Sequence, residues 1–363
     1  MNLVLTGADV LAGTPTSGEI YVTDGLIAAE AAPDARVVDL GGGYLTSGLI
    51  DLHTHVFLPA KTLGVPADQV GLSQGVTTVV DAGSAGARDF ARFREEAVNT
   101  QRTRVLAWLN VASIGLVDGR RELVDLGNVD LDASSAVIEA NRDLIVGIKA
   151  RMSSSVVGGN GTEPLRLAIE LGERTGLPVL IHTGNRPPEM AACLEMLRPG
   201  DVCSHAFHGK PGGILDEHGQ PIRQAIEARE RGVRFDVGHG EASLNFSVIA
   251  RAKQAGLEPD TISTDIHEGN YHGPVHSLAV TMSKMLALGF DLDKVVDGVT
   301  RAPAAVVGRP ELSGLRVGDP ADLTAFRLVE TVRSYVDSDG NTLTGDQELV
   351  CTHVVRGGEL HVL

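Results

Sequence analysis

The chain has 363 residues, of which 43% are apolar and 21% charged, and its formal net charge is −16. This balance is typical of a folded globular protein and excludes a disordered one. The negative charge argues against nucleic acid or an anionic membrane as a partner, because both repel it. No segment approaches the roughly 18 uninterrupted apolar residues of a membrane helix, and the three cysteines fit a reducing compartment. We therefore expect a cytoplasmic enzyme.

Short apolar runs alternate with helical patterns along the middle of the chain, which is typical of βα units around a parallel sheet. The predicted strands cover residues 45–52, 76–83, 104–111, 143–150, 177–184, 200–207, 233–240 and 261–269. Apolar residues recur at helical spacing in residues 87–99, 164–176, 222–232, 247–256 and 277–289. Eight strands with their helices over about 260 residues have the size of a (β/α)8 barrel. An open doubly wound sheet is the alternative, but eight consecutive parallel strands favour closure.

Both ends of the chain differ from the middle. They contain short alternating runs separated by Gly and Asp turns, and neither end is long enough for a stable sheet core of its own. We predict that the two ends pair into one small β-sandwich beside the barrel. The predicted fold class is thus α/β, with a composite β-sandwich domain of residues 1–46 and 313–363 and a barrel domain of residues 47–312.

Polar side chains stand where the predicted strands end, which is where such barrels hold their active sites. His53 and His55 have i, i+2 spacing, so a strand places both imidazoles on one face. A lone histidine there would more commonly be a hydrogen-bonded structural residue. Several imidazoles and a carboxylate from separate strands, however, form a ligand set for a metal ion. The further candidates at the ends of later strands are Lys149, His182, His205 and Asp265.

Lys149 lies in an apolar strand, where an unpaired ammonium is costly to bury. One interpretation is a side chain that extends from the strand end into solvent. The other is that burial lowers the pKa of the amine, so that the neutral form takes up CO₂. The resulting carbamate has two oxygens and could bridge two metal ions. The predicted ligands around Lys149 favour the second interpretation.

These residues together resemble the amidohydrolase superfamily, in the subtype with a dinuclear metal centre bridged by a carboxylated lysine. GLIDLHTH, GIKAR, LIHTG, CSHAFHG and ISTDIH stand where that family places its ligands, and the match covers the whole chain. The resemblance implies two divalent metal ions, for which zinc suits the ligand types best. It implies that His53, His55 and Asp265 bind the more buried ion. His182 and His205 would bind the second, and Lys149, N6-carboxylated by CO₂, would bridge both.

Within the superfamily, DVGHGEAS, ISTDIH and the helix TMSKMLALG are most similar to the amidohydrolase/deacetylase subgroup. This similarity implies hydrolysis of an amide or ester in a small acylated molecule, such as an N-acyl amino acid or an acetylated hydroxy acid. The implied mechanism is attack by a metal-bridging hydroxide, with Asp265 as the general base and acid that carries the proton to the leaving group. Relatives are often homo-oligomers, and we expect one here.

Two other functions remain as alternatives. A cyclic amide hydrolase of the dihydroorotase or hydantoinase type would use the same metal centre with a different pocket. Dihydroorotases carry an arginine two residues past the HxH motif, whereas Val56 and Phe57 follow His55 here. A non-catalytic relative would have lost metal ligands, and this chain keeps the whole set.

Four further residues are candidates for contact with the substrate. Arg151 lies two residues beyond Lys149 and shares its strand face; the alternative is an ion pair at the barrel rim. His208 and Lys210 belong to a glycine-rich loop after the sixth strand, which a solvated turn explains equally well. His239 ends the seventh strand, and we predict that it hydrogen-bonds the substrate.

Overall fold

The computed structural model describes residues 1–11, 18–60 and 63–363, and a curved parallel sheet forms its centre. The strand order is β13-β12-β11-β10-β9-β8-β7, so each strand pairs with the next one along the chain. This sequential order is that of a (β/α)8 barrel. The strands are β7 (Leu49–Thr54), β8 (Val76–Gly86), β9 (Arg104–Asn110), β10 (Ile145–Met152), β11 (Val179–Thr183), β12 (Val202–Ser204) and β13 (Arg234–Phe235).

The eighth predicted strand is replaced by a bent segment. Thr261 forms a parallel bridge to Asp236, and Ile266 forms one to Thr54, so residues 261–266 join β13 to β7. Between the two bridges, Asp265 has a φ of +49°, a left-handed conformation that interrupts an extended ladder. The predicted α/β barrel fold is confirmed, although residues 261–269 do not form a continuous strand.

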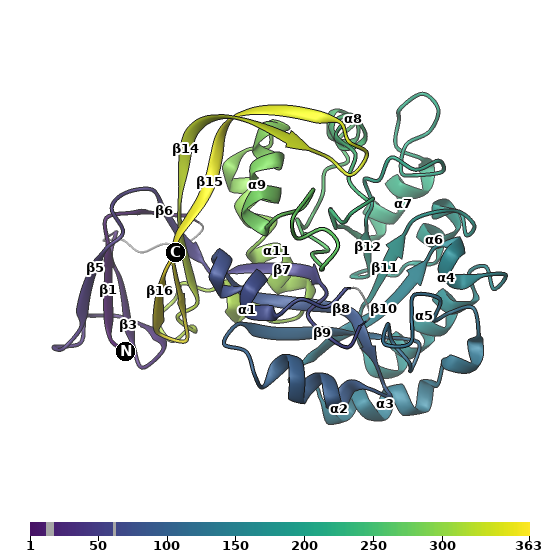
Figure 1. Ribbon diagram of the computed structural model, residues 1–363, viewed down its shortest axis with the longest axis horizontal. Coiled ribbons are helices and arrows are strands. Elements are labelled where there is room, and N and C mark those ends of the chain that lie inside the picture. Colours follow the sequence, from purple (N-terminus) through teal and green to yellow (C-terminus); the bar gives the residue numbers. More distant parts are fainter. Residues whose placement is uncertain (12–17, 61–62) are drawn as a thin grey trace.

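Helices surround this sheet (Figure 1). The best defined is α5, which begins beside Pro164 and ends at Gly176, whose φ of +70° suits a helix terminus. No helix in the described ranges is long and apolar enough to cross a bilayer. The α-helices are α1 (Ala67–Val70), α2 (Phe90–Phe93), α3 (Leu131–Ala140), α4 (Ser154–Val157), α5 (Glu163–Thr175), α6 (Met190–Met196), α7 (Arg223–Arg231), α8 (Phe246–Gln254), α9 (Leu278–Ala287), α10 (Leu292–Asp297) and α11 (Arg301–Val306). A π-helical turn follows α2 at Arg94–Val98, and 3₁₀ turns lie at Leu72–Gln74, Leu126–Asn128 and Pro310–Ser313.

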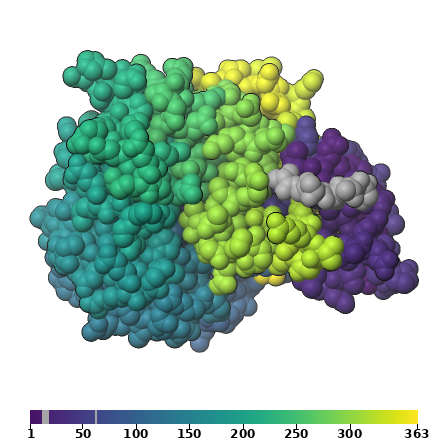
Figure 2. All heavy atoms as spheres, turned by 180° about the vertical axis from the view of Figure 1, so that it is seen from behind, coloured from purple at the N-terminus to yellow at the C-terminus, as the bar shows by residue number. Residues whose placement is uncertain are grey.

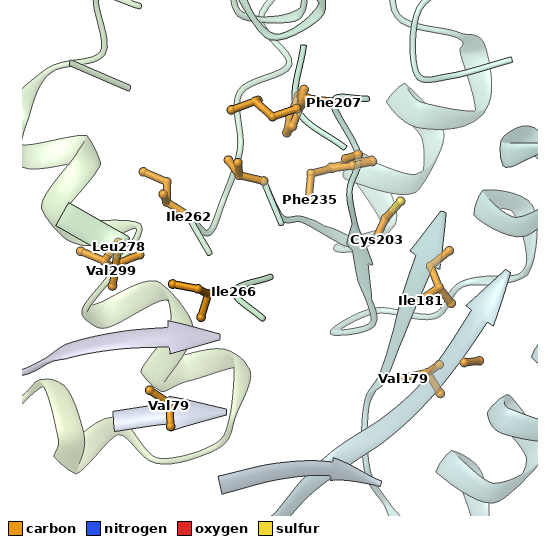
Figure 3. Close-up of a cluster of buried hydrophobic side chains, with 14 of the residues drawn as sticks. Val79, Val179, Ile181, Cys203, Phe207, Phe235, Ile262, Ile266, Leu278 and Val299 are labelled. Atoms are coloured by element: carbon orange, nitrogen blue, oxygen red, sulfur yellow. The ribbon is translucent and has the colours of Figure 1, made fainter. Parts of the chain in front are cut away.

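Two apolar clusters support the strands. The larger lies between the sheet and the helices, where Ile181 of β11, Phe235 of β13 and Leu278 of α9 are buried (Figure 3). The second includes Leu180 and Val202 together with residues of α11. Because side chains alternate along a strand, Leu180 shares its face with His182 two residues later. The second cluster therefore forms an apolar floor beneath the candidate ligands.

The two ends of the chain form two further sheets, which share one buried cluster that includes Leu3, Val22 and Leu323. The N-terminal sheet is seen as a lobe beside the barrel in Figure 2. The four-stranded sheet has the order β4 (Leu26–Ala28), β3 (Ile20–Thr23), β1 (Leu3–Thr6) and β5 (Arg36–Asp39). The five-stranded sheet has the order β16 (Glu359–Val362), β15 (Thr342–Arg356), β14 (Leu323–Val336), β6 (Tyr44–Ser47) and β2 (Asp9–Val10).

The hairpin of β14 and β15 reaches well beyond these terminal sheets. Its strands have 14 and 15 residues, but only Leu323–Phe326 of β14 pairs with β6. The remainder arches over α9 toward α8 (Figure 1), and Tyr335 and Leu349 are buried in the main core of the barrel. The C-terminal segment, which we expected in a sandwich beside the barrel, therefore also extends over the barrel itself.

Candidate metal centre and active site

Three predicted ligands meet where β7 and the bent segment 261–266 end. Oδ1 of Asp265 lies 3.1 Å from Nε2 of His55 and 3.3 Å from Nε2 of His53. One ligand atom of each residue lies within 4.8 Å of the others, and all three residues are buried. The backbone N–H of Asp265 donates to the carbonyl of His53, which holds the strained turn against β7. This arrangement has the ligand types and spacing of a divalent metal site.

Lys149 lies directly beside this group. Its Nζ is 3.0 Å from Nε2 of His53, and the residue has 0% exposure. Burial lowers the pKa of the Lys149 ammonium to about 7, although the charge of Asp265 opposes this. A large share of these side chains is therefore the neutral amine at neutral pH, with its lone pair available. The structure brings the buried lysine and the histidines together.

His205 and His182 lie near the same carboxylate. Nε2 of His205 is 3.6 Å from Oδ2 of Asp265, and the rings of His182 and His205 meet edge to face with centroids 4.3 Å apart. Nδ1 of His205 donates to the carbonyl of Gly238, so Nε2 carries the lone pair. Within the described residues that buried Nε2 has no hydrogen-bond partner. Such an atom is costly in a folded protein, and a bound cation would satisfy it.

Ser204 and Asp236 fix the ring of His53 through its Nδ1, on the side away from Asp265. Oγ of Ser204 lies 2.8 Å from Nδ1 of His53 and donates to Oδ2 of Asp236 over 2.6 Å. Because the Ser204 proton is used in this way, Nδ1 of His53 is the donor, and its Nε2 presents a lone pair toward Asp265. Ser204 and Asp236 were not predicted as parts of the site. Their only signal was a polar side chain within an apolar strand.

His55 has an equivalent support on β8. Its Nδ1 lies 2.8 Å from Oγ of Ser84, whose backbone N–H donates to Oδ1 of Asp81 over 2.7 Å. The other oxygen of Asp81 accepts the backbone N–H of Val56 over 2.9 Å. Asp81 thus fixes both the chain after His55 and the residue that contacts its ring.

The protonation states also suit a cation. Burial holds the pKa of His53 and of His182 well below the usual value, and lowers that of His205 to about 3. These imidazoles are therefore neutral. Burial alone would raise the pKa of Asp265, but positive charge on the side of His53 and His55 outweighs it and holds this pKa well below its usual range. With the imidazoles neutral, a bound cation is the group that would supply this charge. Neutral imidazoles and an ionised carboxylate are the forms that bind metal ions.

The centre opens into a cavity of about 140 Å³, which His55, His182 and Asp265 line on one side. The rest of its lining includes basic and acidic side chains. The other lining residues are Leu63, Leu116, Arg120, Arg151, Lys210, Glu241, Ala242, Ser243 and His267.

Two of the predicted substrate contacts reach this cavity. Arg151 lines it, and its Nη1 lies 3.1 and 3.2 Å from the two oxygens of the fully buried Glu122 carboxylate. Arg151 thus forms an ion pair and also lines the cavity, and its contact with a substrate stays a prediction. Lys210 also lines the cavity, and burial lowers the pKa of its ammonium. Arg120 was not predicted, because it lies in a loop whose path the sequence does not indicate.

The other two predicted contacts lie elsewhere. Neither His208 nor His239 is among the described residues that line the cavity. Nδ1 of His208 accepts the backbone N–H of Lys210 over 3.1 Å, so His208 supports the loop. His239 has 0% exposure: Nδ1 lies 2.9 Å from the carbonyl of Gly240, and Nε2 lies 2.7 Å from Nζ of Lys284. Both ring nitrogens of His239 are thus taken by the protein, which leaves none for a substrate.

Residues 44–360 match the model of the amidohydrolase family. The chain belongs to this family. It is 38% identical to a deacetylase of Agrobacterium fabrum over 325 residues, which are 88% of this chain and 80% of that protein. A solved structure titled as an adenine deaminase has a TM-score of 0.95 and 34% identity over 100% of both chains. Another, titled as a dihydroorotase, has a TM-score of 0.93 and 35% identity over 99% of this chain and 97% of that one.

These comparisons confirm the resemblance drawn from the sequence. Membership of the amidohydrolase family makes the chain a hydrolytic enzyme. The family and the buried group of His53, His55 and Asp265 together imply that it uses a divalent metal ion.

Proposed function

We propose that this amidohydrolase is a dinuclear metal-dependent deacylase that removes an acyl group, acetyl above all, from a small carboxylic acid. The observation that carries the proposal is the buried group of His53, His55 and Asp265 beside a small cavity that basic residues help to line. The similarity to a deacetylase over most of the chain supports it.

Two ions would share the ligands of the proposed centre. His53, His55 and Asp265 would hold one ion, and their burial and mutual spacing support this role. The second would bind near His205, whose unpartnered Nε2 supports it, and beside His182. Zinc suits imidazole and carboxylate ligands best.

Lys149 would bridge the two ions as its N6-carboxylate. The neutral Lys149 amine adds to the carbon of CO₂ and loses one proton, which gives a carbamate anion with two oxygens. The position of Nζ, 3.0 Å from Nε2 of His53, supports the bridge. So does the lowered pKa of about 7, because only the unprotonated amine reacts with CO₂.

When bound, the two ions supply a water of near-neutral acidity and polarise the acyl carbonyl. Asp265 would accept a proton from the attacking water and pass it to the leaving nitrogen or oxygen. Its low pKa keeps the carboxylate ionised and able to accept. The hydroxyls of Ser204 and Ser84 keep the imidazoles of His53 and His55 in the ligand orientation throughout.

The cavity charges favour a substrate with a carboxylate. Lys210 is the cation that would receive this carboxylate, because Glu122 largely offsets the charge of Arg151 and Arg120 also interacts within the protein. The acidic residues of the lining are Glu241 and Asp265. Cavities for drug-sized ligands measure roughly 300–1,000 Å³, so a space of about 140 Å³ suits an acetyl group on a short acid.

A cyclic amide hydrolase is the second candidate, because the similarity to a structure titled as a dihydroorotase favours it. The chain departs from that class after the HxH motif. Phe57 has 0% exposure there and packs on Phe93, with ring centroids 5.5 Å apart. This position therefore offers no cation to a substrate carboxylate.

A substrate panel tests the proposal directly. Zinc-loaded enzyme would be assayed with N-acetyl amino acids, both enantiomers of O-acetyl hydroxy acids, their carboxamide analogues, dihydroorotate, hydantoins and adenine. We expect kcat/KM for at least one acetylated acid to exceed that for its carboxamide, the cyclic amides and adenine by about 100-fold or more. Efficient turnover of a cyclic amide or of adenine alone would contradict the proposal.

A further inference from the structure

The tip of the β14–β15 hairpin, residues 337–341, contacts a loop at the rim of the cavity. The hydroxyl of Ser338 hydrogen-bonds the carbonyls of His239 and Gly240, at 3.1 and 3.0 Å. The backbone N–H of Ser338 donates to the carbonyl of Leu244, and the N–H of Leu244 donates back to the Ser338 hydroxyl over 3.1 Å. One serine thus joins the hairpin to three positions of the loop after β13.

A buried lysine holds the same junction from within the barrel. Lys284 lies on α9, the TMSKMLALG helix, with 1% exposure. Its Nζ donates to the carbonyls of Pro274 (2.7 Å) and Val336 (2.9 Å) and lies 2.7 Å from Nε2 of His239. An ammonium has three donors, and these partners use all three. Lys284 therefore ties α9 and the hairpin to the loop that contains His239.

This loop also lies directly behind the candidate catalytic carboxylate. Gly240 has a φ of +57°, and a β-carbon there would lie 2.8 Å from Oδ2 of Asp265. The N–H of Gly240 donates to the carbonyl of Thr264 over 2.8 Å. The next residue, Glu241, lines the cavity. A displacement of Gly240 would therefore move or release Asp265.

The hairpin tip makes one further contact with this loop, at Asn245, and also reaches a second cavity loop, at Gly209. Oδ2 of Asp339 accepts a hydrogen bond from Nδ2 of Asn245 over 2.8 Å. A β-carbon at Gly209 would overlap the Asp339 carboxylate, so only a glycine allows this close approach. Lys210, which lines the cavity, follows immediately. The tip therefore lies against both loops that border the cavity on this side.

We propose that Ser338 and Lys284 are positioning residues for the hydrolytic reaction. They hold the hairpin tip against residues 239–244, and this loop holds Asp265 in place. Burying the Lys284 side chain, which is 1% exposed, costs the hydration free energy of its amino group, whereas an apolar side chain of similar size would lose none. What the lysine provides is directional contact with three segments. The inference rests on the proposed function, since Asp265 acts in that reaction.

The first test compares three serine variants of the metal-loaded enzyme. Ser338→Ala removes the hydroxyl, Ser338→Thr keeps it, and Ser334→Ala is the matched control at an exposed serine of β14. Small displacements of reacting groups lower kcat strongly, so we expect kcat to fall by about 10-fold in Ser338→Ala while KM changes by less than about 3-fold. Ser338→Thr and Ser334→Ala should match the wild type, and all three should keep their metal content. An unchanged kcat in Ser338→Ala would overturn the inference.

Amide hydrogen exchange gives a second readout that needs no turnover. We expect faster exchange in residues 239–245 in Ser338→Ala and Lys284→Met, but not in Ser334→Ala. Unchanged exchange in Ser338→Ala would also overturn the inference, and this variant suffices if Lys284→Met does not fold. If the wild type hydrolyses none of the acylated acids, the proposed function fails, and the exchange result alone decides whether the hairpin holds the loop.

Discussion

The barrel has a groove at one end of its strands and a cavity at the other, and the larger of the two has fewer features of an active site. A groove of about 830 Å³ lies where the strands begin, whereas the cavity at their carboxyl ends measures about 140 Å³. Of the two, only the small cavity is lined by candidate ligands, namely His55, His182 and Asp265. The buried His205, whose Nε2 has no hydrogen-bond partner among the described residues, lies 3.6 Å from Asp265. The charges of the groove are largely satisfied within the protein, in the pairs Arg198–Asp201, Arg234–Asp260 and Arg301–Asp297.

Strained backbone conformations also occur at the carboxyl ends of the strands, beside the small cavity. Among the described residues, four that are not glycine have a positive φ, and two of these are His205 and Asp265. Such conformations persist only where the surrounding structure holds them, and they gather at functional sites. Unsatisfied ligand atoms and strained backbone therefore locate the chemistry of this fold better than the volume of a pocket does.

The largest effect should come from Lys149→Ala at the small cavity. This change removes the proposed bridge, so we expect loss of the dinuclear centre and of measurable hydrolysis. Metal content by elemental analysis and kcat/KM are the measurements. Lys294→Ala is the matched control in the groove and should keep both. Added short carboxylic acids should restore part of the activity of Lys149→Ala by replacing the carbamate. Two bound metals with full activity in that variant would refute the bridge.

Asp265→Asn should have the next largest effect. The amide keeps an oxygen near His53 and His55 but cannot carry a proton, and such assistance is worth about 10²–10⁴-fold in rate. We expect kcat to fall by that factor while metal content changes little, with Asp297→Asn in the groove unaffected.

The pH profile sharpens this second prediction. As pH falls through the pKa of Asp265 in the enzyme, the carboxylate gains a proton and loses its capacity to accept one. The wild type should thus show an acidic fall in kcat/KM. Because the pKa of Asp265 is held well below its usual range, this fall should lie at the acid end of the profile and be absent in Asp265→Asn. An unaltered acidic fall in the variant would assign the proton transfer to another group.

Arg151 and Lys210 should differ although both line the small cavity. Arg151→Met leaves the buried Glu122 carboxylate without its partner, which typically costs about 3–5 kcal/mol of stability. Lys210→Met should instead leave the unfolding free energy nearly unchanged and reduce kcat/KM for an acylated acid by about 2–5 kcal/mol of transition-state stabilisation. Urea denaturation and steady-state kinetics separate the two. Equal kcat/KM for wild type and Lys210→Met would argue for a neutral substrate.

Local rules explain what the sequence predicted. The i, i+2 spacing of His53 and His55 and the position of Lys149 in an apolar strand follow from strand geometry, and the structure brings these residues within contact distance. The support of His53 by Ser204 could not be predicted, because it joins positions 151 residues apart. The alternation of residues 323–356 indicated strands but not their path over α9. Because the sequence did not indicate how α9 packs, we expected His239 to contact the substrate, whereas in the structure its Nε2 contacts Lys284.

The smallest effect should come from the groove itself. The Arg301 and Asp297 side chains are 60% and 30% exposed and lie four residues apart, across the turn between α10 and α11. A solvent-exposed pair contributes about 0.2–1 kcal/mol, because water solvates both charges when they separate. Arg301→Ala should therefore lower the unfolding free energy in urea by no more than this and leave kcat/KM unchanged. Because the groove lies across the apolar floor from the metal centre, a large loss of activity in Arg301→Ala, with metal content intact, would mean that the two ends of the barrel are coupled. The groove would then contribute to hydrolysis, although its internally paired charges argue against such a role.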